Sequence, residues 1–122
     1  MDEKTYEIYE EEGIGSVKVT DEVIAIIAGL AATEVEGVDS MAGNITNEIV
    51  SKLGWKNLSA GVRISCIDGN VSVFLSLVMK MGYNIPKVSK EVQEKVKSAI
   101  ENMTELKVLT VDIRIANVRV EE

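Results

Sequence analysis

The sequence predicts an α/β (α+β) fold: a single two-layer domain with a small mixed β-sheet and two main helices on one face. Three observations carry this prediction. Residues 23–32 contain no polar side chain, as in a covered helix. Residues 71–79 alternate in the manner of a long strand, and residues 88–103 carry one apolar stripe at helical spacing. The expected order of elements is β-α-(short α)-β-β-α-β.

Length and composition predict one domain behind an acidic tail. The chain has 122 residues, 46% of them hydrophobic, which suits one core and is too short for two. Residues 1–12 hold six acids against Lys4, so they carry −5 of the net charge of −7. We expect residues 1–13 to form an acidic, poorly ordered N-terminal tail, and residues 14–118 to form the domain. As an alternative for the tail, Tyr6, Ile8 and Tyr9 could add a few extended residues to a sheet edge.

The N-terminus lacks the basic and apolar regions of a signal peptide. The apolar run at 23–32 is shorter than the roughly 20 residues that cross a bilayer. We therefore expect a cytoplasmic protein with no direct membrane insertion.

A short strand and an apolar helix open the predicted domain. The strand covers residues 14–19 and runs directly into a helix over about 21–36, capped by Thr20 and ended by Gly37. A helix that is apolar all round must be covered on more than one side. Two coverings stay open. We favour the sheet together with a short helix at about 46–53, and the alternative is another protein chain.

The second half predicts a hairpin, a crossover helix and a last strand. Residues 62–66 and 71–79 alternate on either side of residues 68–70, whose Asp-Gly-Asn sequence favours a tight turn. Pro86 lies in the first turn of the second helix, and the last strand covers about 106–115. Because a strand–helix–strand crossover favours parallel strands, we expect the two strands that flank this helix to be parallel.

The residue types that most often carry catalysis are missing. The chain has no histidine, and its one cysteine, Cys66, lies in an apolar strand-like run that favours a buried, inert thiol over a reactive one. The glycines form no GxGxxG, GxxG or Walker-type loop. Three pairs of acids remain, at helix ends or on solvated faces: Asp21 with Glu22, Glu34 with Glu36, and Glu91 with Glu94. We predict no catalytic residue, cofactor or metal site, and no enzyme.

Trp55 is the only tryptophan and stands beside Lys56 and Asn57 in a predicted loop. Its ring either packs on the short helix in a small satellite core, which we favour, or contacts a partner. Tryptophan is enriched at interface hot spots. Trp55, Lys56 and Asn57 are therefore the candidate partner contact. The basic residues of the second helix are more simply a solvated face than a binding patch.

Several short sequence segments occur in an order that is also found in a known protein family. They are Val19 to Ala32 with Glu36-Gly37-Val38, Leu53-Gly54 with Lys56-Asn57 and Gly61-Val62, Asp68-Gly69, Gly82 with Asn84-Ile85-Pro86, Val92 to Val96, and Met103-Thr104 with Leu106, Val108 and Val111. Over about residues 14–118 the chain resembles the alkaline shock protein family, also called the Gls-type envelope stress response proteins of Gram-positive bacteria. One departure is Trp55, where the family often has an arginine. This makes a hydrophobic contact there more plausible than a basic one.

The resemblance implies a non-enzymatic cytoplasmic protein of cell-envelope homeostasis and alkaline or general stress, without catalytic residues or cofactors. Some members self-assemble and are held near the membrane by an integral membrane protein. The expected partners are therefore the chain itself, as a homo-oligomer, and a membrane-anchored protein. Another branch is linked to fatty-acid synthesis, so a regulator of a lipid-synthesis enzyme (the acetyl-CoA carboxylase branch) is the alternative. A KH-like nucleic-acid binder is the weakest alternative, because GxxG and a basic groove are missing.

Overall fold

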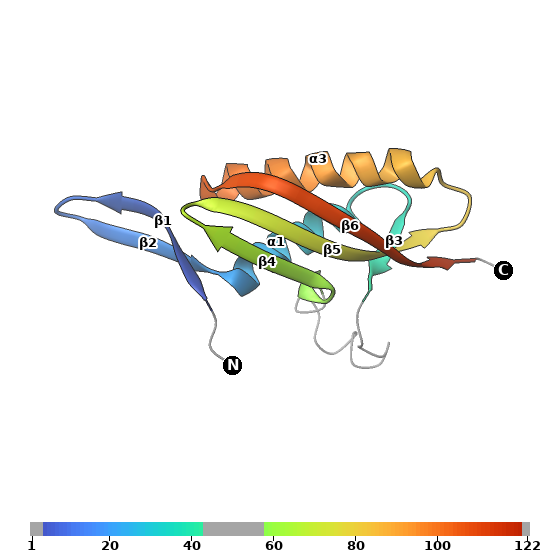
Figure 1. The fold of residues 1–122 in the computed structure, drawn as a ribbon, viewed down its shortest axis with the longest axis horizontal. Helices are drawn as coiled ribbons and strands as arrows, with labels where there is room; N and C mark the ends of the chain where they lie inside the picture. The colour runs from blue at the N-terminus through green and yellow to red at the C-terminus, as the bar shows by residue number, and fades with distance from the viewer. Residues whose placement is uncertain (1–3, 43–57, 121–122) are drawn as a thin grey trace.

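The computed structural model describes residues 4–42 and 58–120 and confirms the predicted α+β class. In these residues, two helices and a mixed sheet enclose an apolar core, and a two-stranded hairpin extends from one end (Figure 1). The elements are β1 (Thr5–Glu11), β2 (Gly15–Thr20), α1 (Asp21–Thr33), β3 (Val38–Met41), β4 (Val62–Ile67), β5 (Asn70–Lys80), α3 (Ile85–Thr104) and β6 (Lys107–Arg119).

β5 is the central strand of the four-stranded sheet. β6 runs parallel to it along one edge, from Asn70 to Lys80, and β4 pairs antiparallel along the other edge as far as Leu75. β3 continues this second edge, with Val38 opposite Met79. The parallel pairing of β5 with β6 across α3 confirms the crossover that the sequence predicts.

The hairpin between β4 and β5 also forms as predicted. Asp68 and Gly69 both have positive φ, 52° and 78°, as the central residues of a tight hairpin turn require. Beyond the turn, alternate side chains of β5 enter the core, and each is at most 1% exposed. These side chains are Val71, Val73, Leu75, Leu77 and Met79.

α1 is the predicted apolar helix, although it ends at Thr33 and not near residue 36. Thr20 caps its first turn by accepting a hydrogen bond from the Val23 amide at 3.2 Å. Ile24, Ala28 and Ala32 are fully buried in the shared core. Their small and branched side chains let the helix lie close to the sheet and to α3.

A backbone segment also covers α1. A Cβ placed on Gly29 would lie 1.7 Å from the carbonyl oxygen of Leu58, so only a glycine permits this approach. The sheet, α3 and Leu58 therefore cover α1 on several sides, all within the chain. The short helix predicted at 46–53 lies outside the described residues.

α3 begins and ends where its sequence favours it. Asn84 caps the start by accepting a hydrogen bond from the Lys87 amide at 2.9 Å, and Pro86 follows in the first turn. Most of the predicted apolar stripe is buried, with four members at most 4% exposed, whereas Met103 at its end is 67% exposed. Its buried members are Val88, Val92, Val96 and Ile100. The other side of the helix is charged and faces solvent.

The N-terminus differs from the poorly ordered tail that the sequence led us to expect over residues 1–13. Residues 5–11 form β1, which pairs antiparallel with β2, and Thr5 lies opposite Thr20. Tyr6 and Ile8 pack against the core, so the base of this hairpin is anchored by apolar contacts. The expected order of elements has no strand at β3, and β6 continues to Arg119, beyond the predicted residue 115.

Candidate interaction surfaces

The predicted partner contact at Trp55, Lys56 and Asn57 lies outside the described residues and stays a prediction. Leu58 is the first described residue after it, and its backbone lies against Gly29 of α1. The chain therefore returns to the domain beside the apolar helix.

The distal part of the β1–β2 hairpin, residues 9–17, is an exposed surface that sequence reasoning missed; we call it the arm. It extends beyond the two-layer body (Figure 1). Ile14 is 76% exposed, Val17 is 50% exposed and Tyr9 is 44% exposed. The Tyr9 hydroxyl donates a hydrogen bond to the Glu11 carboxylate, and this bond raises the pKa of Tyr9. The alternation of apolar and acidic residues in β1 was the available signal.

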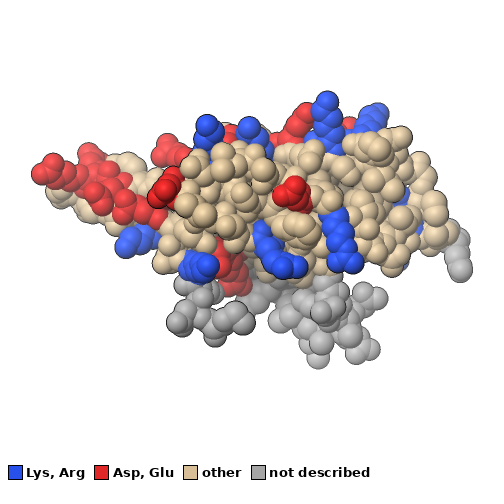
Figure 2. Space-filling view, in the orientation of Figure 1, with Lys and Arg blue, Asp and Glu red and all other residues tan. Residues whose placement is uncertain are grey.

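Charge is distributed unevenly over the molecule. Acidic side chains gather on the arm, whereas Lys and Arg side chains lie across the sheet face that is turned toward the viewer in Figure 2. Strand register places Arg63 and Arg114 on that face, opposite the helices, together with Asp112. Arg63 stacks over the Phe74 ring at 5.5 Å from the ring centroid. The face is thus polar with one aromatic side chain, and it differs in sign from the arm.

The outer edge of β6 is only partly covered by α3. The Val108 amide donates a hydrogen bond to the Glu101 carboxylate at 2.9 Å. The Gln93 side-chain amide donates to the Val111 carbonyl, also at 2.9 Å. Between Val111 and Val118, no side chain of residues 4–42 and 58–120 makes a hydrogen bond to the backbone at this edge. The Val118 amide then donates to the side chain of Asn117.

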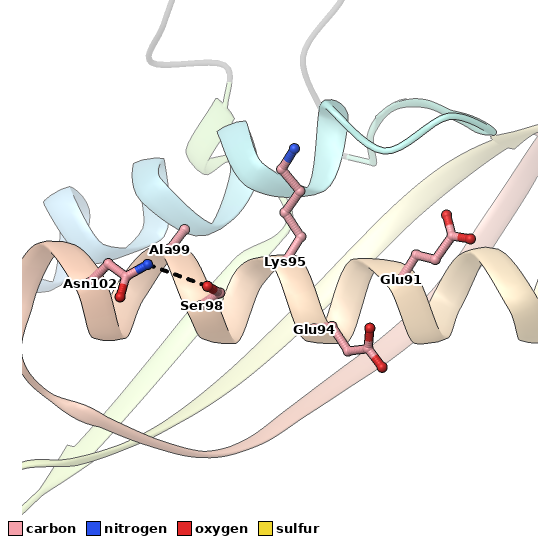
Figure 3. Close-up of a pocket in the computed structure, with 6 residues that line it drawn as sticks. All are labelled: Glu91, Glu94, Lys95, Ser98, Ala99 and Asn102. Carbon is pink, nitrogen blue, oxygen red and sulfur yellow. Dashed lines mark hydrogen bonds between the residues drawn. The ribbon is translucent and has the colours of Figure 1, made fainter.

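A shallow groove lies along the solvent side of α3 (Figure 3). The Asn102 amide donates a weak hydrogen bond of 3.4 Å to the Ser98 hydroxyl. Lys95 points toward α1, where it pairs with Glu34 at 3.6 Å. The carboxylates of Glu91 and Glu94 point in different directions, so this pair does not form a two-carboxylate centre.

The other two acidic pairs lie near the two ends of α1. Asp21 and Glu22 lie in the first turn of α1, where acids interact favourably with the helix dipole. Glu34 pairs with Lys95, and Glu36 accepts a hydrogen bond from the Tyr83 hydroxyl at 3.2 Å. These contacts agree with a structural role for the four acids.

Cys66 is half-buried on the helix side of β4, where the sequence predicted a buried thiol. Burial raises the pKa of this thiol, which a backbone hydrogen bond at Gly69 only partly offsets. A raised pKa keeps the thiol neutral near pH 7 and lowers its nucleophilicity.

The described residues contain no group of three or more His, Cys, Asp or Glu side chains placed to hold a metal ion. Of the helices within them, none has the length and apolar character needed to span a membrane.

Comparison with known proteins identifies the family. The model of the alkaline shock protein 23 family, described by a cell envelope-related function, matches residues 9–120. The uncharacterized protein YqhY of Bacillus subtilis (strain 168) is 35% identical over 111 residues, which cover 91% of this chain and 82% of that protein. Spy1614 of Streptococcus pyogenes, also uncharacterized, is 35% identical over 108 residues, with 87% and 89% covered.

A further Streptococcus pyogenes protein, named stress response regulator gls24 homolog, is 25% identical over 109 residues, or 88% of this chain and 61% of that protein. A solved MamM CTD structure covers 83% of this chain at 12% identity and a TM-score of 0.48, which is too low to inform fold or function. The family match spans both described helices and the complete four-stranded sheet, and the chain belongs to the alkaline shock protein family, whose function is related to the cell envelope.

Proposed function

We propose that this chain is a non-enzymatic protein of the envelope stress response that acts through self-association and by docking on a membrane-anchored partner. The main support for this proposal is the exposed apolar surface of the arm. Ile14 and Val17 are exposed on a ribbon that extends past both layers. A two-stranded ribbon is only marginally stable in water, and its apolar side chains gain free energy when another surface covers them. The arm therefore suits contact with another protein.

The family supports the physiological part of the proposal. The family description names a cell envelope-related function, and one relative is named a stress response regulator homolog. Neither name includes an enzymatic activity.

The described side chains support the non-enzymatic part. Among residues 4–42 and 58–120, the candidate acids lie in a first turn, in a salt bridge, in a hydrogen bond or in a shallow groove. The single thiol has its pKa raised by burial, which opposes its use as a nucleophile.

The docking proposal is tested by capture of the tagged full chain from separated membrane and soluble fractions after crosslinking in cells. The test variant is Ile14→Asp, on the arm. The matched control is Ile67→Asp, because Ile67 is similarly exposed, at 71%, but lies beside the β4–β5 turn. We expect the wild type and the control to be recovered with an integral membrane protein. Recovery with Ile14→Asp should fall about tenfold, since a buried Ile side chain is worth about 1.5–3 kcal/mol.

Each other outcome counts against the proposal. Equal recovery with all three proteins means that the arm is not the docking surface. Capture of carboxylase subunits from the soluble fraction, without a membrane protein, favours the regulator of lipid synthesis. If neither class of protein is captured, the docking part is wrong.

A further inference from the structure

We propose that two copies of this chain associate through the outer edge of β6, pairing antiparallel about a two-fold axis at Ile113. The inference rests on the proposed self-association and specifies its surface. The partner strand is β6 of a second copy, so that the two four-stranded sheets become one continuous sheet.

The outer edge of β6 is available to a second strand. β6 covers residues 107–119 and pairs with β5 on one side only. Contacts from α3 satisfy backbone groups at Val108 and Val111, near the start of the strand. A long strand with an uncovered edge offers a row of backbone donors and acceptors to another strand.

The backbone groups in the middle of β6 alternate in direction between β5 and the outer edge. In a parallel pair, alternate residues turn both N–H and C=O toward the same edge. The Val111 carbonyl points outward to Gln93, so the backbone groups of Ile113 and Ile115 point outward as well. In the proposed pair, Ile113 exchanges hydrogen bonds with the second copy's Ile113. The Val111 amide donates to the second copy's Ile115 carbonyl, while the Val111 carbonyl keeps its hydrogen bond from Gln93.

The middle of β6 is complementary in charge to a second, antiparallel copy of itself. The two-fold axis at Ile113 places Asp112 directly opposite Arg114 of the second copy, and this happens twice in the dimer. Both side chains are exposed on the open face of the sheet, and their neighbours on β5 are the uncharged Phe74 and Ser76. Within the described parts of the chain, the side chains of Asp112 and Arg114 form no ion pair or hydrogen bond. Opposite charges at directly facing positions stabilise a strand pair.

The other outer edge of the sheet lacks this property. On the open face β4 presents Arg63, Ser65 and Ile67. A two-fold pairing of β4 with itself places Arg63 opposite an uncharged residue or another arginine, depending on the centre. β6 is therefore the edge whose sequence is self-complementary in charge. Lys107 would face Arg119 at the two ends, which confines favourable pairing to the middle of the strand.

The test is sedimentation velocity of the purified full chain over a range of concentrations. The variants are Asp112→Arg, Arg114→Asp and the double variant Asp112→Arg/Arg114→Asp. The control is Glu91→Arg, which makes the same change of charge as Asp112→Arg at an exposed position on α3. Circular dichroism and thermal unfolding check that each variant is folded.

We expect a dimer for the wild type and for Glu91→Arg. Asp112→Arg should raise the dimer Kd at least about tenfold, because two attractive pairs become two repulsive ones. Arg114→Asp should do the same. The double variant should restore the wild-type Kd, since each pair is then re-formed with its charges exchanged.

The outcomes separate this inference from the proposed function. A dimer whose Kd responds equally to Asp112→Arg and Glu91→Arg overturns the β6 interface and leaves self-association standing. A double variant that stays as weak as the single variants also overturns the interface. A monomeric wild type at every concentration contradicts both this interface and the self-association on which it rests.

Discussion

At the scale of the residue, Thr104 is the polar side chain that the described core keeps. It is 3% exposed, and its hydroxyl donates a hydrogen bond of 2.6 Å to the Ile100 carbonyl. The same hydroxyl accepts one of 3.1 Å from the Leu106 amide. Between them Glu105 has a φ of 64°. One hydroxyl therefore ends α3 and fixes the turn that returns the chain as a parallel strand.

We predict that Thr104→Val lowers the free energy of unfolding by about 1–3 kcal/mol, because the Leu106 amide is left buried without an acceptor. Thr104→Ser is the control, since it keeps the hydroxyl and loses one methyl group, worth about 0.8 kcal/mol. Urea denaturation of the three proteins gives the comparison. If Val is tolerated as well as Ser, the hydroxyl does not stabilise this turn.

At the scale of the element, sequence periodicity was sufficient where one element buries one face. β5 alternates strictly from Val71 to Met79, and α3 carries a single stripe between a capping Asn84 and a left-handed end at Glu105. In these elements, local preference and tertiary contact favour the same conformation, so the sequence alone predicts them.

The elements that the sequence did not predict depend on pairing and packing with other elements. β1 was read as a tail because of its acids, yet it gains a ladder from β2 and core contacts through Tyr6 and Ile8. β3 is four residues long and exists because β5 extends past β4 and offers a free edge at Leu77 to Met79. Tertiary pairing of this kind overrides weak local propensity.

The candidate surfaces show the same limit. The alternation of Asp112 and Arg114 is visible in the sequence, but only the sheet order shows that this strand lies at an edge. Ile14 and Val17 were assigned to an ordinary short strand, and only the structure places them on a ribbon beyond the body. The sequence shows the residue types at these positions, but only the arrangement of the strands shows that their side chains are exposed.

Gly29 provides a test of how closely elements approach. Ala is the better helix former by about 1 kcal/mol, so propensity alone predicts that Gly29→Ala stabilises α1. The Cβ would instead meet the Leu58 carbonyl at 1.7 Å, and the backbone would have to move. We expect a net loss of about 1–3 kcal/mol in thermal or urea unfolding. Lys97→Ala, on the exposed side of α3, is the control and should be near neutral. A stabilised Gly29→Ala protein would mean that the Leu58 segment does not press on α1.

At the scale of the whole molecule, the fold has two parts of different local stability. The body is built around β5, which has a strand on both edges and helices over one face. The arm has only its own ladder and carries exposed Ile14 and Val17. The acids of the arm and the basic residues of the sheet face also separate the molecule into regions of opposite charge (Figure 2). A surface that is apolar, acidic and weakly supported is suited to becoming ordered against a partner.

Amide hydrogen exchange of the isolated protein measures this difference directly. We predict that backbone amides of β5 exchange slowest, near the limit set by global unfolding. Amides of residues 9–17 should exchange at least about a hundredfold faster, because opening the arm exposes few buried apolar contacts. The slow amides of β5 are the internal control within the same sample. Protection of the arm equal to that of β5 would mean that a second surface already covers it. If this protection rises with protein concentration and β5 stays unchanged, that surface belongs to another copy of the chain.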